Sequence, residues 1–391
     1  MAQNKVQEEQ PIGWGAKAII LAGGPAISLA TSLIQAVLPS IQRDLAHGPD
    51  EAFLVKMLVG VNTLAMAIGA ALTGFLVDRF GLKRVMTINY AVYAVAGTAG
   101  VYLNDLHLLL VSRFLLGLAA AGAVTGSIII INARMGTQKR ATWLGYYNAV
   151  AQAGSVVLNP VSGMLAEISW HWAFAIYGIA APFAVLAFAA LDGKAPKKVE
   201  QEHPAGPPLF SWFPFRFAFL GVCLGIIIYI PAVYLPFLLD NLGMKSPRTI
   251  SIVLTGDIIA GSIAALLYGR ARRVLSEYQA FSISVAFAGL GLFIAALAPN
   301  VVLVIIGSVV FGIGVAWFQP NLMFVLAGRV APEQQGRAAG LVKSSVYLGS
   351  PVAVFLTEPV SRSYGATGAV LTVVLFSAAL FVLALPKLAR R

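Results

Sequence analysis

The sequence has little charge, few histidines and a single cysteine. Only 11% of its 391 residues are charged, against about 25% in soluble domains. With Cys223 alone, no intrachain disulfide can form, and the four histidines are scattered rather than spaced as zinc ligands. The sequence also has no Walker A loop and no nucleophile–base or metal set. We therefore expect no cofactor, no metal site, no ATP-driven cycle and no enzyme.

Apolar residues are in excess instead. They make up 59% of the chain, against about 45–50% in soluble domains, and they form long runs such as 106–131 and 301–327. In hydrocarbon every backbone polar group must be paired internally, so only helices or closed barrels can span a membrane. Barrel strands would alternate over about 10 residues. The uninterrupted runs predict an all-α membrane protein.

Twelve apolar segments are long enough to be transmembrane helices. The first follows a polar stretch without an obvious small-residue cleavage site, so we interpret it as a retained helix rather than a signal peptide. The predicted segments are 17–39, 53–77, 84–103, 106–131, 141–166, 171–191, 214–239, 249–269, 278–298, 301–327, 338–358 and 364–386.

The basic residues predict how these helices are oriented. If the N-terminus is cytoplasmic, most of the 27 Lys and Arg residues fall on the cytoplasmic side, as the positive-inside rule requires. The outer side then holds only Arg43, Lys56, Lys245, Arg248 and Arg362. We therefore expect an inner-membrane protein with both termini cytoplasmic. The basic excess indicates topology and contact with anionic membrane lipid, not binding of nucleic acid.

A polar, proline-containing stretch divides the chain into halves. It follows the sixth predicted helix, which gives an amino-terminal lobe (1–191), a cytoplasmic linker (192–213) and a carboxy-terminal lobe (214–391). The halves are weakly similar, since Gly154-Ser155 with Pro160 parallels Gly349-Ser350-Pro351. Two parallel six-helix repeats are typical of transporters whose site lies at the repeat interface.

Several short motifs resemble those of one transporter family. The loop after the second helix reads Gly74-Phe75-Leu76-Val77-Asp78-Arg79-Phe80-Gly81-Leu82-Lys83-Arg84. It is similar to the G-x-x-x-D-[RK]-x-G-x-[RK]-[RK] loop of the major facilitator superfamily. Leu38 to Leu45, Arg113 with Gly117, and Ser169 to Phe174 resemble motifs of its drug/proton antiporter branch, with His171 in place of an arginine. The resemblance implies two six-helix lobes, alternating access, proton coupling, a small-molecule substrate and a monomer.

The fifth helix departs from the antiporter pattern. Of the motif positions there, only Pro160 and Gly163 match, whereas Ser155, Asn159 and Met164 do not. The direction of transport therefore stays open.

The resemblance also implies a cytoplasmic latch. Asp78 is expected near the start of the eleventh helix, around 336–339, where free N–H groups and the helix dipole stabilise a carboxylate. The alternative is that these charges only fix topology. The predicted gating residues are Gly74, Asp78, Arg79, Gly81, Lys83, Arg84, Pro160, Gly163 and Arg337.

Three ionisable residues fall within predicted spans. A charge at the bilayer centre costs at least about 2.5–3.5 kcal/mol, which calls for a function or a partner. Arg113 and Asp257 lie about 10 and 12 Å from the outer ends of their helices, one in each half. We predict that Asp257 carries the proton and that Arg113 assists coupling, while Arg113 and Lys343 bind an anionic substrate group. The alternatives are a static ion pair and, for Lys343, snorkelling.

Uncharged polar residues are candidates for the substrate surface. Amide and aromatic groups suit an amphipathic ligand, although each of them could equally form an interhelical hydrogen bond. The predicted lining residues are Gln35, Asn148, Gln152, Tyr229, Gln319, Asn321 and Tyr347. Asp240 and Glu358, at outer helix ends, are expected to be solvated rim residues.

We therefore expect a secondary active transporter that exports a drug-like or metabolite molecule by proton antiport. Proton-coupled uptake of an organic anion is the alternative, favoured by the cationic Arg113 and Lys343. A non-transporting receptor or sensor built on the same fold is a further alternative.

Overall fold

The computed structural model describes residues 13–135, 137–191, 212–330 and 335–388. Within these ranges the secondary structure is helical, without a strand. The first group of helices comprises α1 (Trp14–Ser32), η1 (Gln35–Val37), α2 (Leu38–Leu45), α3 (Pro49–Phe80), α4 (Leu82–Thr98), η2 (Ala99–Val101), α5 (Leu106–Arg134), α6 (Thr137–Ala166), α7 (Trp170–Ala173), η3 (Phe174–Ala180) and α8 (Ala181–Ala190). The second comprises α9 (Trp212–Asn241), α10 (Pro247–Ala271), α11 (Glu277–Ala296), α12 (Val301–Ala327) and α13 (Gln335–Leu388).

The helices are long and apolar enough to confirm a membrane protein. In the described part of the chain, ten helical segments could each cross a bilayer. The predicted third segment corresponds to α4, which has 17 residues. The predicted eleventh and twelfth segments both lie in α13, which is interrupted at Gly365. Gly365 has φ 64° and ψ −161°, a conformation that side chains disfavour, so the chain reverses there on a glycine.

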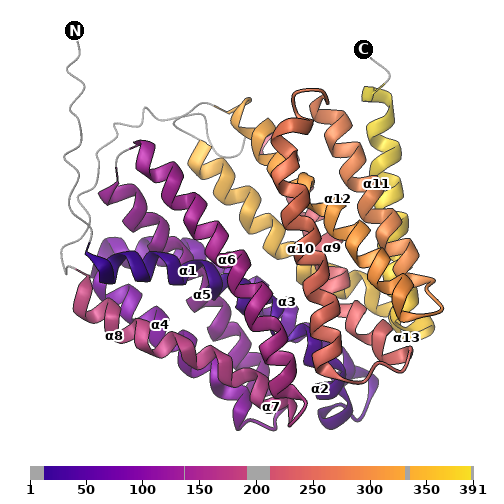
Figure 1. Cartoon of the computed structure of the whole chain (residues 1–391), viewed down its shortest axis with the longest axis horizontal. Helices are drawn as coiled ribbons and strands as arrows, with labels where there is room; N and C mark the ends of the chain where they lie inside the picture. The colour runs from indigo at the N-terminus through magenta and orange to yellow at the C-terminus, as the bar shows by residue number, and fades with distance from the viewer. Residues whose placement is uncertain (1–12, 136, 192–211, 331–334, 389–391) are drawn as a thin grey trace.

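The helices pack as two lobes (Figure 1). We call α1–α8 the amino-terminal lobe and α9–α13 the carboxy-terminal lobe, because most helix contacts lie within these groups. Between the lobes, α3 packs on α13 and α6 packs on α10. The predicted linker lies mostly in 192–211, outside the described residues, so its boundaries stay a prediction.

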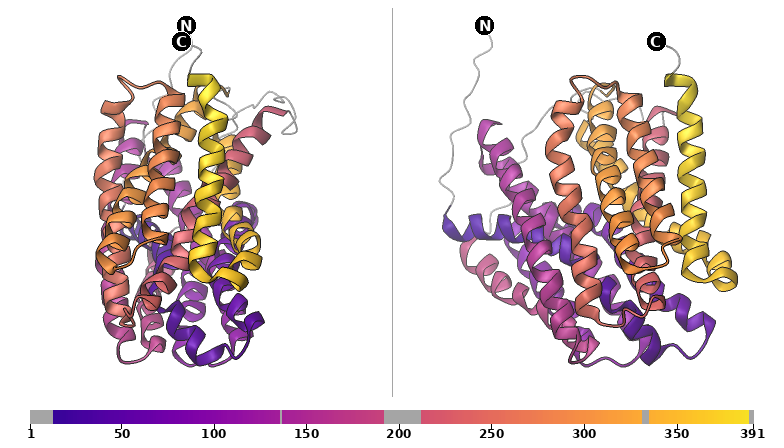
Figure 2. Two further views of the ribbon diagram at one scale, coloured as in Figure 1. Left: turned by 90° about the vertical axis from the view of Figure 1, so that its right-hand side faces the viewer. Right: turned by 45° about the vertical axis from the view of Figure 1, so that its right-hand side comes forward.

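Two ends of the helix bundle are distinguished below. The terminal end holds Gly81, between α3 and α4, and Leu388, where α13 ends. The far end holds the connections α2–α3, α6–α7 and α9–α10, and the two lobes meet there (Figure 2).

Helix α1 is fixed by tyrosine hydroxyl groups. It contains Pro25, which cannot donate a backbone hydrogen bond. Tyr90, Tyr147, Tyr93 and Tyr177 donate to successive carbonyl groups along α1, at distances of 2.8–3.2 Å. The proline-containing helix is therefore held by side chains from α4, α6 and η3.

Candidate functional site

Four charged residues connect the two lobes at the far end. Lys56 on α3 donates to Glu358 on α13 at 2.8 Å, and each side chain is only 10% exposed. Arg362 donates to Glu358 at 3.0 Å and to Asp50 at 2.7 Å. We call Asp50, Lys56, Glu358 and Arg362 the interlobe charge network. The expectation that Glu358 is a solvated rim residue is wrong, because Lys56, 302 positions away, buries it in this network.

Further contacts close the far end around this network. Arg43 donates to Asp240 at 2.7 Å, in a pair that is more exposed than Lys56–Glu358. Phe53 and Phe355 pack with ring centroids 5.3 Å apart. The lobes are therefore joined at this end by both charged and apolar contacts.

Gly163 permits the close approach of α6 to α10. A side-chain carbon at Gly163 would lie 2.8 Å from the carbonyl oxygen of Pro247 and would overlap the hydroxyl of Ser251. Only a residue without a Cβ fits this interlobe contact unchanged. Pro160 lies one turn earlier in the same helix.

At mid-height the interface between the lobes is polar. Gln152 on α6 donates to the hydroxyl of Ser262 on α10 at 3.0 Å. Asn148, one turn before Gln152, is exposed and donates to the carbonyl of Leu144. Two predicted lining residues therefore lie on the α6 surface that approaches the other lobe.

Asp257 lies on α10, the helix that carries Ser262. Its backbone is in close contact with Gly312 of α12, so this part of α10 is held against α12. Its Oδ1 atom is buried and has no hydrogen-bond partner among the residues that the structure describes. A carboxylate oxygen in this position is unusual, because buried polar atoms are normally paired.

Lys343 and two tyrosines lie on the side of the carboxy-terminal lobe formed by α9 and α13. Lys343 is half-buried and forms no ion pair with any described residue, Asp257 included. Tyr347, one turn further along α13, is half-buried, and Tyr229 on α9 is buried.

Three other predicted lining residues are less clearly placed at the interface. Gln35 is half-buried and donates to the Thr31 carbonyl, and Gln319 is exposed. Asn321 accepts from the Tyr268 hydroxyl at 3.1 Å and donates to the Glu277 carbonyl at 2.9 Å. For Asn321 the structure favours the alternative of an interhelical hydrogen bond.

Arg113 is buried inside the amino-terminal lobe. It is 1% exposed and donates to the carbonyl groups of Ala96 and Gly97, each at 2.9 Å. Its guanidinium lies over Phe174 at 4.8 Å and Tyr177 at 5.2 Å, a cation–π arrangement that stabilises a desolvated cation. Because these groups enclose it, Arg113 does not reach the interface between the lobes, and the proposal below does not use it for substrate or proton binding.

The motifs of α2 and α7 at the far end form one structural unit. Trp170 donates its indole N–H to Asp44 at 2.7 Å and stacks on His171. His171 in turn contacts Asn104 at 2.8 Å. Sequence reasoning identified the α2 and α7 motifs separately but gave no signal that they contact each other.

The Asp78 loop is accessible at the terminal end. Gly81 has φ 83°, which glycine adopts readily, and the chain turns there from α3 into α4. Asp78, Arg79 and Arg84 are exposed, and Asp78 forms no hydrogen bond or ion pair with a described residue. Lys83 lies over the Phe188 ring at 4.6 Å, and Gly74 faces open space.

The predicted latch partner cannot be described in the same detail. The surroundings of Gly336 and the side chain of Arg337 lie outside the described part of the structure. The latch therefore stays a prediction. As for metals, no group of three or more potential ligands (His, Cys, Asp, Glu) is found in the described ranges.

Two overlapping parts of the chain, which together cover residues 21–391, match one family. Residues 21–247 and 217–391 fit the family model described as Major Facilitator Superfamily. The chain belongs to this superfamily. It is a membrane transporter and not an enzyme, as the predicted motifs indicated.

Relatives in the superfamily are named for different compounds. The chain is 22% identical to the quinolone resistance protein NorA of Staphylococcus aureus over 332 residues, which is 83% of this chain and 84% of NorA. It is 28% identical to the niacin transporter NiaP of Acinetobacter baylyi over 155 residues, 39% of this chain and only 35% of NiaP. The match to NiaP thus spans about a third of that protein.

Solved structures share the fold. The inward-open xylose transporter XylE of E. coli has a TM-score of 0.74 at 15% identity, covering 92% of this chain and 94% of XylE. An inward-facing, unoccupied bacterial homolog of the human lysosomal transporter Spinster has a TM-score of 0.76 at 13% identity, covering 94% of this chain and 96% of that one. At these identities the similarity establishes the major facilitator fold alone.

Proposed function

We propose that this transporter exports a small drug-like or metabolite molecule across the inner membrane in exchange for protons. The observation that carries the proposal is Asp257, whose buried Oδ1 lacks a hydrogen-bond partner among the described residues. Similarity to NorA over most of both chains supports the direction, as do the antiporter-like motifs of the amino-terminal half.

Asp257 is suited to carry the proton because its charge is costly where it lies. A charged carboxylate at the centre of a membrane costs at least about 2.5–3.5 kcal/mol, and taking up a proton removes that cost. Asp257 belongs to α10, which also contributes Ser262 to the bond with Gln152 in the other lobe. A movement of α10 relative to α6 would therefore change the surroundings of Asp257 as the lobes move.

The charge network and the Asp78 loop suit alternating access. Contacts join the lobes at the far end, whereas Asp78 at the terminal end forms no ion pair with described residues. If both termini are cytoplasmic, as the basic residues predict, the closed end is the outer one, and this supports an inward-facing state. Opening to the outside requires Lys56 and Glu358 to separate.

The substrate surface is proposed to lie between the lobes at mid-height. Asn148 and Gln152 contribute amides from one lobe, and Tyr229 and Tyr347 contribute aromatic rings from the other. Such a combination of aromatic surface with a few polar groups suits an amphipathic molecule. We propose a monomer as the working unit.

Uptake of an organic anion with protons is the second candidate. Lys343 favours it, because this half-buried cation forms no ion pair with any described residue. An anionic substrate would supply the missing partner. Substrate charge therefore separates the two candidates.

Transport by the purified protein in sealed vesicles tests the proposal. Quinolones and aromatic carboxylic acids should be offered under an imposed pH gradient of either sign. Export predicts that a quinolone moves against its gradient while protons move the opposite way. Movement of substrate and protons in the same direction would establish symport instead.

The matched variants are Asp257→Asn and Asp105→Asn. Asp257→Asn should abolish transport driven by the pH gradient but retain exchange of substrate across the membrane, because exchange needs no net proton movement. Asp105 caps α5 through the backbone N–H of Leu108, and asparagine caps equally well, so Asp105→Asn should behave as the wild type. Undiminished gradient-driven transport by Asp257→Asn would remove the carrier role.

A further inference from the structure

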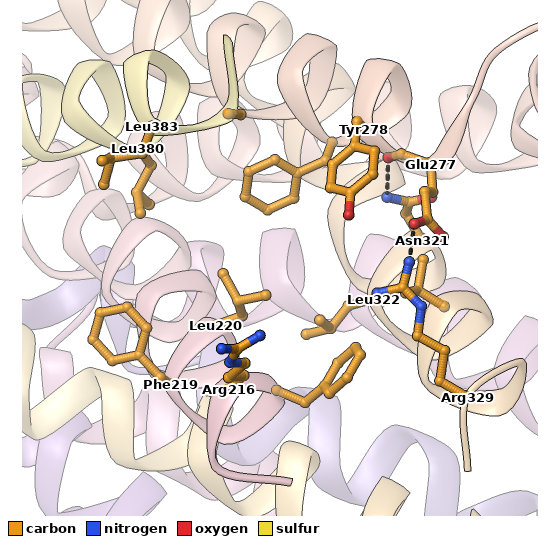
Figure 3. A pocket seen from close by; sticks show the side chains of 14 residues that line it. Arg216, Phe219, Leu220, Glu277, Tyr278, Asn321, Leu322, Arg329, Leu380 and Leu383 are labelled. Carbon is orange, nitrogen blue, oxygen red and sulfur yellow. Dashed lines mark hydrogen bonds and ion pairs between the residues drawn. The ribbon is translucent and has the colours of Figure 1, made fainter. Parts of the chain in front are cut away.

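A second polar site lies inside the carboxy-terminal lobe, at its terminal end. It is a cavity of about 320 Å³ formed by the first turns of α9 and α11 and the last turns of α12 and α13 (Figure 3). These four helix ends lie at or close to the ends of candidate membrane-spanning segments. The cavity is separate from the surface between the lobes that is proposed to bind the transported substrate.

The polar groups that line this cavity carry more positive than negative charge. Two arginines, Arg216 and Arg329, and one glutamate, Glu277, line it. Arg329 forms an ion pair with Glu277. Arg216 and the hydroxyl of Tyr278 point toward the space from different walls (Figure 3). Guanidinium groups bind phosphate oxygens with paired hydrogen bonds.

The polar part of the lining is held in place by hydrogen bonds between helices. Asn321 is buried, accepts from Tyr268 and donates to the backbone carbonyl of Glu277. This connects α10, α11 and α12 at the level of the cavity. The ion pair between Arg329 and Glu277 therefore joins Arg329 to helices that are already held together.

Another part of the lining is apolar and reaches the outer surface of the lobe. Phe219 and Leu380 line it together with Leu383. Phe219 is 62% and Leu383 72% exposed. Both residues lie in helices that span the membrane, so their exposed surfaces face lipid chains rather than water.

We propose that this cavity binds an anionic phospholipid of the adjacent leaflet. The phosphate lies between Arg216 and Arg329, and an acyl chain lies along Phe219, Leu380 and Leu383. Basic pockets between helices at the membrane surface are suited to anionic headgroups. The inference concerns a lipid site and does not depend on the direction of transport or on its coupling.

Two features favour a lipid over a soluble phosphate. The apolar part of the lining offers nothing to a small hydrated anion, and it continues to the bilayer-facing surface. A lipid satisfies both parts at once, since its headgroup is charged and its chains are apolar. A soluble phosphate would use only the arginines.

Binding to the purified full-length protein in detergent micelles tests the site. The probes are phosphatidylglycerol, phosphatidylcholine with the same chains, and glycerol 3-phosphate, and bound molecules are counted by native mass spectrometry. Phosphatidylglycerol should bind more tightly than phosphatidylcholine, and glycerol 3-phosphate should not bind. Arg216→Gln should weaken phosphatidylglycerol about fivefold, because one arginine near an anionic headgroup contributes about that factor.

The matched control is Arg270→Gln. Arg270 is exposed at the end of α10, in the same lobe and at the same end, but does not line the cavity. Its replacement should leave lipid binding unchanged. Equal effects of Arg216→Gln and Arg270→Gln, or equal binding of the two lipids, would overturn the site. Tight binding of glycerol 3-phosphate would show a soluble-anion site instead and would overturn the lipid assignment.

A second measurement uses the wild type only. Phosphatidylglycerol with a photoreactive group in its acyl chain should label peptides of α9 and the end of α13. Labelling confined to other helices would contradict the proposal, whatever the stability of the variants. Because neither assay involves transport, failure of the transport proposal would leave these results unaffected.

Discussion

Replacing Lys56 by methionine should open the far end of the transporter. The substitution keeps most of the side-chain volume but removes the cation that donates to Glu358 at 2.8 Å. Both side chains are 10% exposed, so water replaces the lost interaction poorly. Removing one partner of a buried ion pair costs about 3–5 kcal/mol. Arg362 remains at 3.0 Å from Glu358, so we take the lower bound, about 3 kcal/mol.

This cost falls on one conformation only. When the far end is open the pair is already separated, so the substitution destabilises the closed state alone. A loss of about 3 kcal/mol changes the ratio of closed to open states about 100-fold. Arg43→Gln is the matched control, because its pair with Asp240 is 44% and 23% exposed. Surface pairs contribute about 0–1 kcal/mol, so this variant should change the ratio no more than about fivefold.

Distances between spin labels measure the effect. Labels at His47→Cys and Lys245→Cys report on the far end of each lobe, and Cys223→Ser removes the native thiol. Lys56→Met should move the main distance population to longer values, whereas Arg43→Gln should leave most of it unchanged. Identical distance distributions for Lys56→Met and the wild type would show that the buried pair does not stabilise the closed end.

Three further substitutions test other parts of the structure. Gly163→Val should also favour the open far end in the same distance measurement, because a side chain there meets Pro247 and Ser251. Gly145→Val should not, because nothing lies within 4 Å of the added carbon. Equal distance distributions for the two variants would contradict this prediction. Arg113→Gln should lower the free energy of unfolding by about 2 kcal/mol, since the Ala96 and Gly97 carbonyls lose a charged donor. It should not weaken substrate binding. A loss of substrate affinity with unchanged stability would show that Arg113 belongs to the substrate site. Asp78→Ala should alter transport rates in vesicles if the latch forms during the cycle, and unchanged rates in correctly inserted protein would exclude the latch.

The fold was largely predictable because its determinants are local. Apolar run length fixes where a helix crosses the membrane, and Gly81 and its neighbours form a turn within eleven residues of sequence. The side-chain partners were not predictable in the same way. Glu358 was expected at a solvated rim because its partner Lys56 is 302 positions away and no periodicity links them.

Arg113 illustrates the same limit within one lobe. Its depth in the membrane followed from its position in the helix, but the direction of its side chain did not. It is enclosed by the aromatic faces of Phe174 and Tyr177 and by two backbone carbonyls. Because every residue has a backbone carbonyl, the sequence does not indicate which ones accept from Arg113. The depth of Asn321 in the membrane could likewise be predicted. Whether its side chain binds substrate or a neighbouring helix depends on tertiary packing.

The interlobe charge network has equal numbers of positive and negative members. Asp50 and Glu358 balance Lys56 and Arg362, so separating the lobes would expose a mouth with no net charge from these residues. Such an entrance neither attracts nor repels ions at long range. These four residues would then not distinguish a cationic from an anionic solute, and discrimination would fall to other groups, such as Asp257 and Lys343 deeper in the protein.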